Sequence, residues 1–228
     1  MTEDAYRYPG ILNYNVKQIL KERPKHVSID QIVSHELGSS TTGEKQALSD
    51  LLDLIAFLES RKKNLSQVGG GPGKGYYQLE STTDGGGYTR ANTAYSRIPF
   101  ELTPQWLHEN ISVARDGDQK ISMGVLNKSQ QDFIMSAYLL NDENSKQVIN
   151  NLANEDDPST RLDMMLNYWL DYHWAGWQEK KKNGESVRSE KKIWATKFIR
   201  DDYEYNPNWL ELKGSLGYEF NMDNYNTK

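Results

Sequence analysis

Apolar residues recur at helical spacing along most of the chain. The clearest case runs from Glu44 to Ser60, where leucine and isoleucine repeat every three or four residues, at positions 48, 51, 52, 55 and 58. A shorter run over 28–37 opens with Ser28, a residue type that caps helix N-termini. The spacing predicts helices over 28–37 and 44–60.

Weaker helical patterns follow the same rule over 13–21, 104–114, 129–141, 144–154 and 158–182, the last opening with a proline suited to a first helical turn. Between glycine-rich segments at 69–75 and 84–87 lies a short apolar and aromatic run from Tyr76 to Leu79, and backbone conformations open mainly to Gly are expected on both sides. The chain from 203 onward lacks periodicity and is expected to be an extended arm or a disordered tail. The pattern predicts a mostly α-helical protein.

Composition narrows the classes of function. A chain of 228 residues suits one domain with appendages. The net charge of −5 gives no general attraction to nucleic acid, so no nucleic-acid partner is predicted. No run approaches the roughly 20 apolar residues of a membrane span. Because Cys is absent and the four His are scattered, no metal or cofactor is predicted.

Glu59 is the carboxylate with the most informative position. It follows Ile55 by one helical turn and Leu52 by two, which places it on the apolar stripe of the predicted helix. Partial desolvation and the negative end of the helix dipole both disfavour the anion, so we expect the pKa of Glu59 to be raised and the side chain to act as a general acid. The alternative is a solvent ion pair with a basic residue of 61–63.

The residues after Glu59 form a recognisable succession. Glu59-Ser60 is followed by Ser66, by glycines at 69–71 and 73, and by the segment 75–78, Gly-Tyr-Tyr-Gln. This succession resembles the lytic transglycosylase family of the lysozyme superfamily. In that family a catalytic Glu followed by Ser ends a helix, a second Ser follows, and a Gly-Ala-x-Gly-Leu-Met-Gln segment forms the floor beside the Glu. Gln78 follows Glu59 by 19 residues, close to the family's spacing.

The resemblance implies a role for each matching residue. Glu59 would be the catalytic acid, and the substrate-binding positions would be Ser60, Ser66, Gly75, Tyr76, Tyr77 and Gln78. Lys62 departs from the pattern, because an aromatic residue usually packs there, and Tyr-Tyr replaces Leu-Met. The glycine triplet, with Glu80 after the Gln, is more similar to phage virion proteins in which such domains open the cell wall during genome entry. Tyr168 and Tyr172 would fill a later aromatic position.

The same resemblance implies a reaction. Glu59 would protonate the glycosidic oxygen between muramic acid and glucosamine, and would then take a proton from the sugar's own hydroxyl or from water. Glu80, with Asp84 behind it, is the nearest candidate for a second carboxylate; a surface charge paired with Arg90 is the alternative. The aromatic residues Tyr76, Tyr77, Tyr88 and Trp174 are candidate sugar-subsite walls or, alternatively, core residues.

The predicted architecture is a single mostly α, lysozyme-like domain with a minimal β or loop region. Its parts would be an N-terminal helical extension at 1–43, a lysozyme-like catalytic domain at 44–182, and a C-terminal helix with an extended arm at 183–228. A secretory signal is not apparent at the N-terminus, which fits a virion protein made in a host cytoplasm and acting on peptidoglycan at the bacterial cell wall. Other virion or tail proteins are further candidate partners.

Three other interpretations accompany this one. A non-enzymatic virion or tail structural protein could keep a degenerate lysozyme scaffold, as the departures at Lys62 and 76–77 suggest. A carbohydrate-binding module could use its aromatic residues without catalysis. A phosphate-binding loop needs Gly at 68 and Ser or Thr at 75, where the chain has Val68 and Gly75, so that interpretation is rejected.

Overall fold

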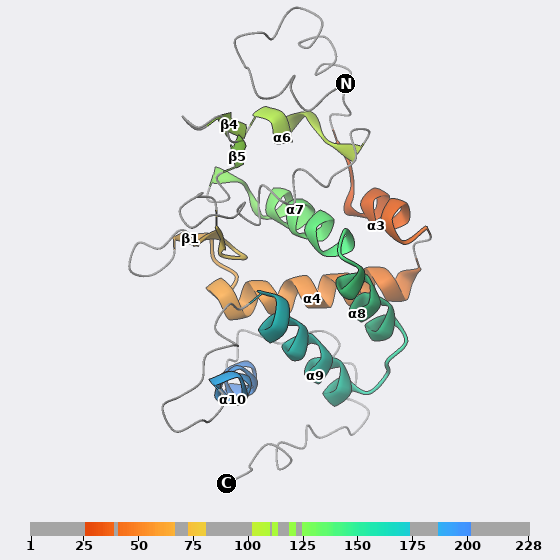
Figure 1. Ribbon diagram of the computed structural model, residues 1–228, viewed down its shortest axis with the longest axis vertical. Helices are drawn as coiled ribbons and strands as arrows, with labels where there is room; N and C mark the ends of the chain where they lie inside the picture. Colours follow the sequence, from red (N-terminus) through yellow and green to blue (C-terminus); the bar gives the residue numbers. More distant parts are fainter. Residues whose placement is uncertain are drawn as a thin grey trace, which may run out of the picture. The chain divides into compact units, whose positions relative to one another are not determined.

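The computed structural model describes residues 26–38, 41–66, 73–80, 102–109, 111–113, 119–121, 125–173 and 187–201 (Figure 1). The helix predicted at 13–21 and the arm predicted from 203 lie outside these residues. Two compact units divide the chain: Met1–Ser40 with Glu59–Asp142 form unit 1, and Thr41–Leu58 with Glu143–Lys228 form unit 2. The boundaries predicted at 43 and 182 came from the resemblance, and they stay a prediction.

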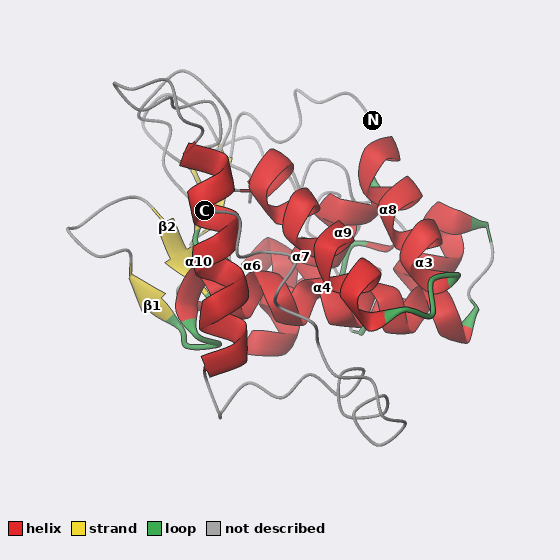
Figure 2. Ribbon diagram, turned by 90° about the horizontal axis from the view of Figure 1, so that it is seen from below, coloured by secondary structure: helices red, strands yellow, loops and turns green. Residues whose placement is uncertain are grey.

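Helices account for most of the described chain, which confirms a mostly α protein. They are α3 (Ile29–Leu37), α4 (Thr42–Ser60), α6 (Gln105–Glu109), α7 (Lys128–Leu140), α8 (Glu143–Ala153), α9 (Pro158–Tyr168) with the π-helix η5 (Trp169–His173), and α10 (Val187–Asp201). Strands β1 (Leu65–Ser66), β2 (Gly73–Gly75) and β3 (Leu79–Glu80) form one antiparallel sheet, and β4 (Ile111–Val113) pairs with β5 (Gln119–Ile121). Figure 2 shows β1 and β2 side by side.

The helix predicted over 104–114 was wrong in its second half. α6 ends at Glu109, and the chain continues as β4 from Ile111 to Val113. Two β-branched residues alternate in this segment, a pattern that suits a strand better than a helix once a partner strand is present. β5 supplies that partner, with Ile111 opposite Ile121.

Unit 1 is organised by α3 packed on α7. Both helices begin with a reciprocal capping box: Gln31 N donates to Ser28 Oγ at 3.2 Å while Ser28 N donates to Gln31 Oε1 at 2.8 Å, and Asn127 and Gln130 repeat the arrangement on α7. α3 ends at Gly38, whose φ of 69° is the left-handed conformation that Gly adopts readily. The caps confirm the predicted start at Ser28.

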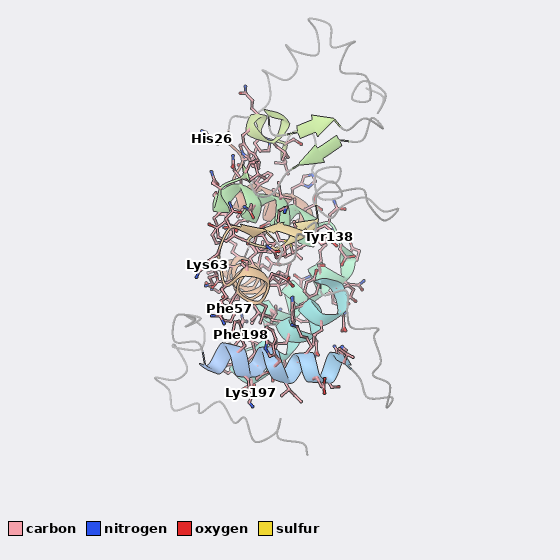
Figure 3. All side chains as sticks on the ribbon, turned by 90° about the vertical axis from the view of Figure 1, so that its left-hand side faces the viewer. His26, Phe57, Lys63, Tyr138, Lys197 and Phe198 are labelled. Atoms are coloured by element: carbon pink, nitrogen blue, oxygen red, sulfur yellow. The ribbon has the colours of Figure 1, made fainter. Side chains whose placement is uncertain are left out.

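In unit 2, helix α4 as far as Leu58 packs with α8, α9 and α10. Asp50 of α4 and Arg161 of α9 form an ion pair with 2.6 Å between Oδ2 and Nη2, their side chains being 6% and 11% exposed. Arg161 also donates to the carbonyls of Leu152 and Glu155. Phe57 lies against Phe198 of α10, with ring centroids 4.9 Å apart (Figure 3). Among the residues that the structure describes, the apolar core of unit 2 thus contains the Asp50–Arg161 ion pair.

Candidate active site

The candidate site lies in unit 1, where α4 ends. Glu59 is half-buried at the penultimate helical position, and Ser60 closes the helix. Ile55 and Leu52, one and two turns earlier on the Glu59 face, are buried as predicted. The apolar surface is wider than a stripe, because from Leu51 to Leu58 only Asp53 is not buried. Glu59 is therefore the first carboxylate after a nearly continuous apolar stretch.

The helix ends abruptly because two non-glycine residues adopt the left-handed conformation. Arg61 and Lys62 have φ angles of 52° and 56°. Each such residue costs on the order of 1 kcal/mol, because Cβ crowds the following carbonyl. The pair turns the chain sharply after Ser60 and directs it into strand β1.

Ser60 joins the helix end to the glycine-rich segment. Its side chain is 4% exposed, and Oγ donates a hydrogen bond of 2.7 Å to the carbonyl oxygen of Tyr76 while accepting one of 3.2 Å from Lys63 N. A buried hydroxyl engaged in this way is not presented to a substrate. The prediction that Ser60 binds substrate is therefore replaced by a positioning role: it holds the segment 75–78 beside the end of α4.

Gly73 and Gly75 of the glycine-rich segment belong to a strand, β2, and not to a loop. β2 pairs with β1 through Leu65 opposite Gly75, and with β3 through Lys74 opposite Leu79. The second pairing encloses a four-residue turn, 75–78, that carries the aromatic run. Small residues suit β2 because it is the central strand of the three-stranded sheet and because Gly73 and Gly75 are both buried.

Two left-handed residues bracket this turn. Gly75 has a φ of 81° and Gln78 a φ of 48°. The side chain of Gln78 folds back, and Nε2 donates to the carbonyl oxygen of Gly75 at 2.8 Å. The predicted conformational need for glycine is confirmed at Gly75, and Gln78 stabilises the turn through its own amide.

Gln131 of α7 is a site residue that the sequence did not reveal. It is completely buried, and its Oε1 accepts a 2.8 Å hydrogen bond from Tyr76 N. Its Nε2 donates to Leu126 O at 2.9 Å and to Asn64 Oδ1 at 3.3 Å. The signal in the sequence was its helical phase: Gln131 stands three and four residues before Ile134 and Met135, on the apolar face of the predicted helix, where an amide needs such partners.

The two tyrosines of the turn have different environments. Tyr77 is completely buried, and its hydroxyl donates to Asp132 Oδ1 at 2.5 Å; Lys128 Nζ contacts both oxygens of that carboxylate at 2.9 Å. A buried ring cannot stack on a sugar, so Tyr77 is corrected from a subsite wall to a core residue. Tyr76 is half-buried, with Lys128 Nζ 5.7 Å from its ring centroid, and its ring remains a candidate wall.

Other predicted positions are described only in part. Ser66 lies in β1 opposite Lys74, and Glu80 ends β3 opposite Gly73, but their side chains lie outside the described structure, as do Asp84, Tyr88, Arg90 and Trp174. The other two candidates belong to unit 2. Tyr168 is 3% exposed with its hydroxyl 2.7 Å from Ser145 Oγ, which makes it a core residue; Tyr172, 43% exposed, stacks on it.

The comparisons with known proteins give no match that bears on the candidate site. No family model matches the chain, and neither the curated proteins nor the solved structures contain a match. Among the described residues, no group of three or more His, Asp or Glu side chains is arranged to hold a metal ion. None of the described helices combines the length and apolarity needed to cross a membrane.

Proposed function

We propose that this protein cleaves the glycan strand of peptidoglycan, with Glu59 as the single acid and base, as a lytic transglycosylase or a muramidase. We further propose that it is a phage virion component that aids genome entry and that residues 44–182 form a lysozyme-like domain. The observation that carries the proposal is the hydrogen bond from Ser60 Oγ to Tyr76 O.

This hydrogen bond matters because it joins the two halves of the motif. The resemblance requires a Glu-Ser at a helix end and a glycine–aromatic–Gln segment beside it. Ser60 directly follows Glu59, and its bond to Tyr76 brings the segment 75–78 to the end of α4. The contact is the one that the resemblance expects between the two parts of the motif, and it supports the proposal in that way.

The chemistry follows from the half-buried carboxyl at the helix end. Glu59 transfers its proton to the bridging oxygen, the bond from the sugar's anomeric carbon to that oxygen breaks, and an oxocarbenium-like species forms. The resulting carboxylate then accepts a proton from the muramic acid's own hydroxyl, which closes an anhydro ring, or from water, which gives hydrolysis. The half-buried ring of Tyr76 is available to stack on a sugar face.

The test is turnover of purified peptidoglycan by the full chain. Glu59→Gln keeps the size of the side chain but cannot transfer a proton, so we expect the rate to fall by about a hundredfold or more. Glu143→Gln, at the exposed start of α8, is the matched control and should keep wild-type activity. Mass spectrometry of the products separates anhydro-sugar from reducing ends.

The rival function is a non-enzymatic virion or tail protein on the same scaffold. It is favoured by the buried, internally bonded state of Ser60 and Tyr77, two positions expected to meet substrate. The rival predicts no glycan cleavage at any pH by the wild-type chain. Equal turnover by wild type and Glu59→Gln would contradict a Glu59-dependent mechanism.

A further inference from the structure

Gln131 lies on α7, far in sequence from the motif, yet it contacts three segments that surround the candidate site. Its amide bonds Asn64 after the end of α4, Tyr76 in the turn, and Leu126 before α7. Both N–H groups and the oxygen of the amide are used, so its orientation is determined by its partners. Since Gln131 is completely buried, water cannot replace any of these bonds.

The peptide groups of Tyr76 are held from two directions. Its carbonyl oxygen accepts from Ser60 Oγ at 2.7 Å, and its N–H donates to Gln131 Oε1 at 2.8 Å. One bond reaches the turn from the end of α4 and the other from α7. Removing either leaves the Tyr76 backbone held from one direction only, although the Tyr77 hydroxyl still bonds Asp132 of α7.

The neighbouring glycine makes room for this contact. A Cβ on Gly75 would lie far inside contact distance of Gln131 Oε1 and 2.9 Å from its Cδ. The missing side chain at Gly75 therefore allows the amide to reach the Tyr76 N–H. Gly75 and Gln131 are complementary in shape as well as in hydrogen bonding.

We infer that Gln131 is a positioning residue for the candidate active site, acting through the Tyr76 backbone to hold the turn 75–78 at the end of α4. The inference rests on the proposed function, because positioning is measured by what it does to turnover. As a positioning residue, Gln131 does not touch substrate. Its loss should lower kcat more than it raises KM, because the turn would be displaced relative to Glu59 while its groups remain present.

Two substitutions separate positioning from simple stabilisation. Gln131→Met fills the same volume but leaves the Tyr76 N–H without an acceptor. Gln131→Glu keeps an acceptor oxygen for Tyr76 but buries a carboxyl, which is the less stable choice in an apolar site. A structural role alone predicts that activity follows stability, with Met above Glu. Positioning predicts the opposite order for kcat, with Glu above Met.

The expected result is a fall in kcat of about 10- to 100-fold for Gln131→Met with KM changed less than about twofold. Ser136→Ala is the control, because Ser136 is buried on the same helix with no hydrogen-bond partner among the described residues. Wild-type kcat in Gln131→Met, or kcat values that follow the stability order, would overturn the inference.

Amide hydrogen exchange gives a test that needs neither activity nor a variant. The Tyr76 N–H lies in a turn, yet it should exchange as slowly as amides inside α7, because its acceptor is buried. Rapid exchange at Tyr76 in the wild-type chain would overturn the inference by itself. A wild-type chain that protects Tyr76 but cleaves no peptidoglycan would refute the proposed function and leave the Gln131 contact established.

Discussion

Gly75→Ala is the substitution whose effect the structure specifies most closely. Gly75 has a φ of 81°, where an L side chain is strained, and a Cβ built there would collide with the Gln131 amide. The collision is with a buried side chain that is held by three hydrogen bonds, so the amide cannot move aside without losing at least one of them. Gly75→Ala should therefore lower the free energy of unfolding both through backbone strain and through the collision with Gln131.

Comparison with Gly38 separates the backbone cost of Gly75→Ala from the cost of its contact with Gln131. Gly38 ends α3 with a φ of 69°, and a Cβ there would meet nothing within 4 Å. Gly38→Ala should therefore cost only the backbone term, about 1 kcal/mol. Gly75→Ala should cost that amount plus about 1 to 3 kcal/mol for overpacking against Gln131. The difference between the two variants isolates the contact.

Urea denaturation of the two variants measures this difference. Both glycines belong to unit 1, so amide exchange in α3 and α7 should accompany the optical signal, because two units need not unfold together. A free energy of unfolding that falls equally in Gly38→Ala and Gly75→Ala would refute the close approach of Gln131. The double variant Gly75→Ala/Gln131→Ala, which removes the obstructing amide, should cost less than the sum of its two parts.

Other substitutions test separate parts of the structure. Tyr77→Phe removes a 2.5 Å hydrogen bond to Asp132 and should lower the free energy of unfolding by about 1.5 to 3 kcal/mol in urea denaturation, with Tyr76→Phe in the same turn as a control. Ser28→Ala removes a capping box and should cost about 1 kcal/mol and speed exchange in the first turn of α3; an unchanged rate would contradict the cap. Burial raises the pKa of Asp50 above its usual value despite its bonds to Gln46 and Arg161. The stability of wild type relative to Asp50→Asn should therefore be greatest below the usual Asp pKa and decline as pH rises through the raised value, which denaturation at several pH values measures.

Periodicity predicted the helices because apolar positions repeat on the face that each helix buries, and α4, which is buried nearly all round from Leu51 to Leu58, still shows the repeat. α3, α4, α7 and α8 begin and end within two residues of the predicted bounds, and Ser28 and Pro158 stand at helix starts as expected. These features are local: a cap, a proline and a stripe act within one or two turns. The short strands were missed because two- and three-residue segments carry no periodic signal and depend on partners elsewhere in the chain.

In the candidate site, too, the features set by near neighbours in the sequence were predicted and those set by distant contacts were not. The sequence placed Glu59 at a helix end and glycine in a left-handed position, since both depend on near neighbours. Which of two adjacent tyrosines points inward could not be predicted, because the turn is oriented by contacts to α7, 55 residues away. Ser60 was assigned to substrate for the same reason: nothing local shows that its hydroxyl already has a partner in Tyr76.

Three non-glycine residues around the site have strained backbone conformations. Arg61, Lys62 and Gln78 adopt left-handed conformations next to the end of α4 and the turn, each at a cost on the order of 1 kcal/mol. Arg61→Gly relieves this backbone cost but also loses the side chain of Arg61, so Arg61→Ala is the reference that loses the side chain alone. The free energy of unfolding should be about 1 kcal/mol higher in Arg61→Gly than in Arg61→Ala, which a shift of the urea midpoint would show. Where the basic side chain and the strained turn serve catalysis beside Glu59, Arg61→Gly should be more stable than Arg61→Ala and less active than wild type, a combination that the non-enzymatic interpretation does not predict.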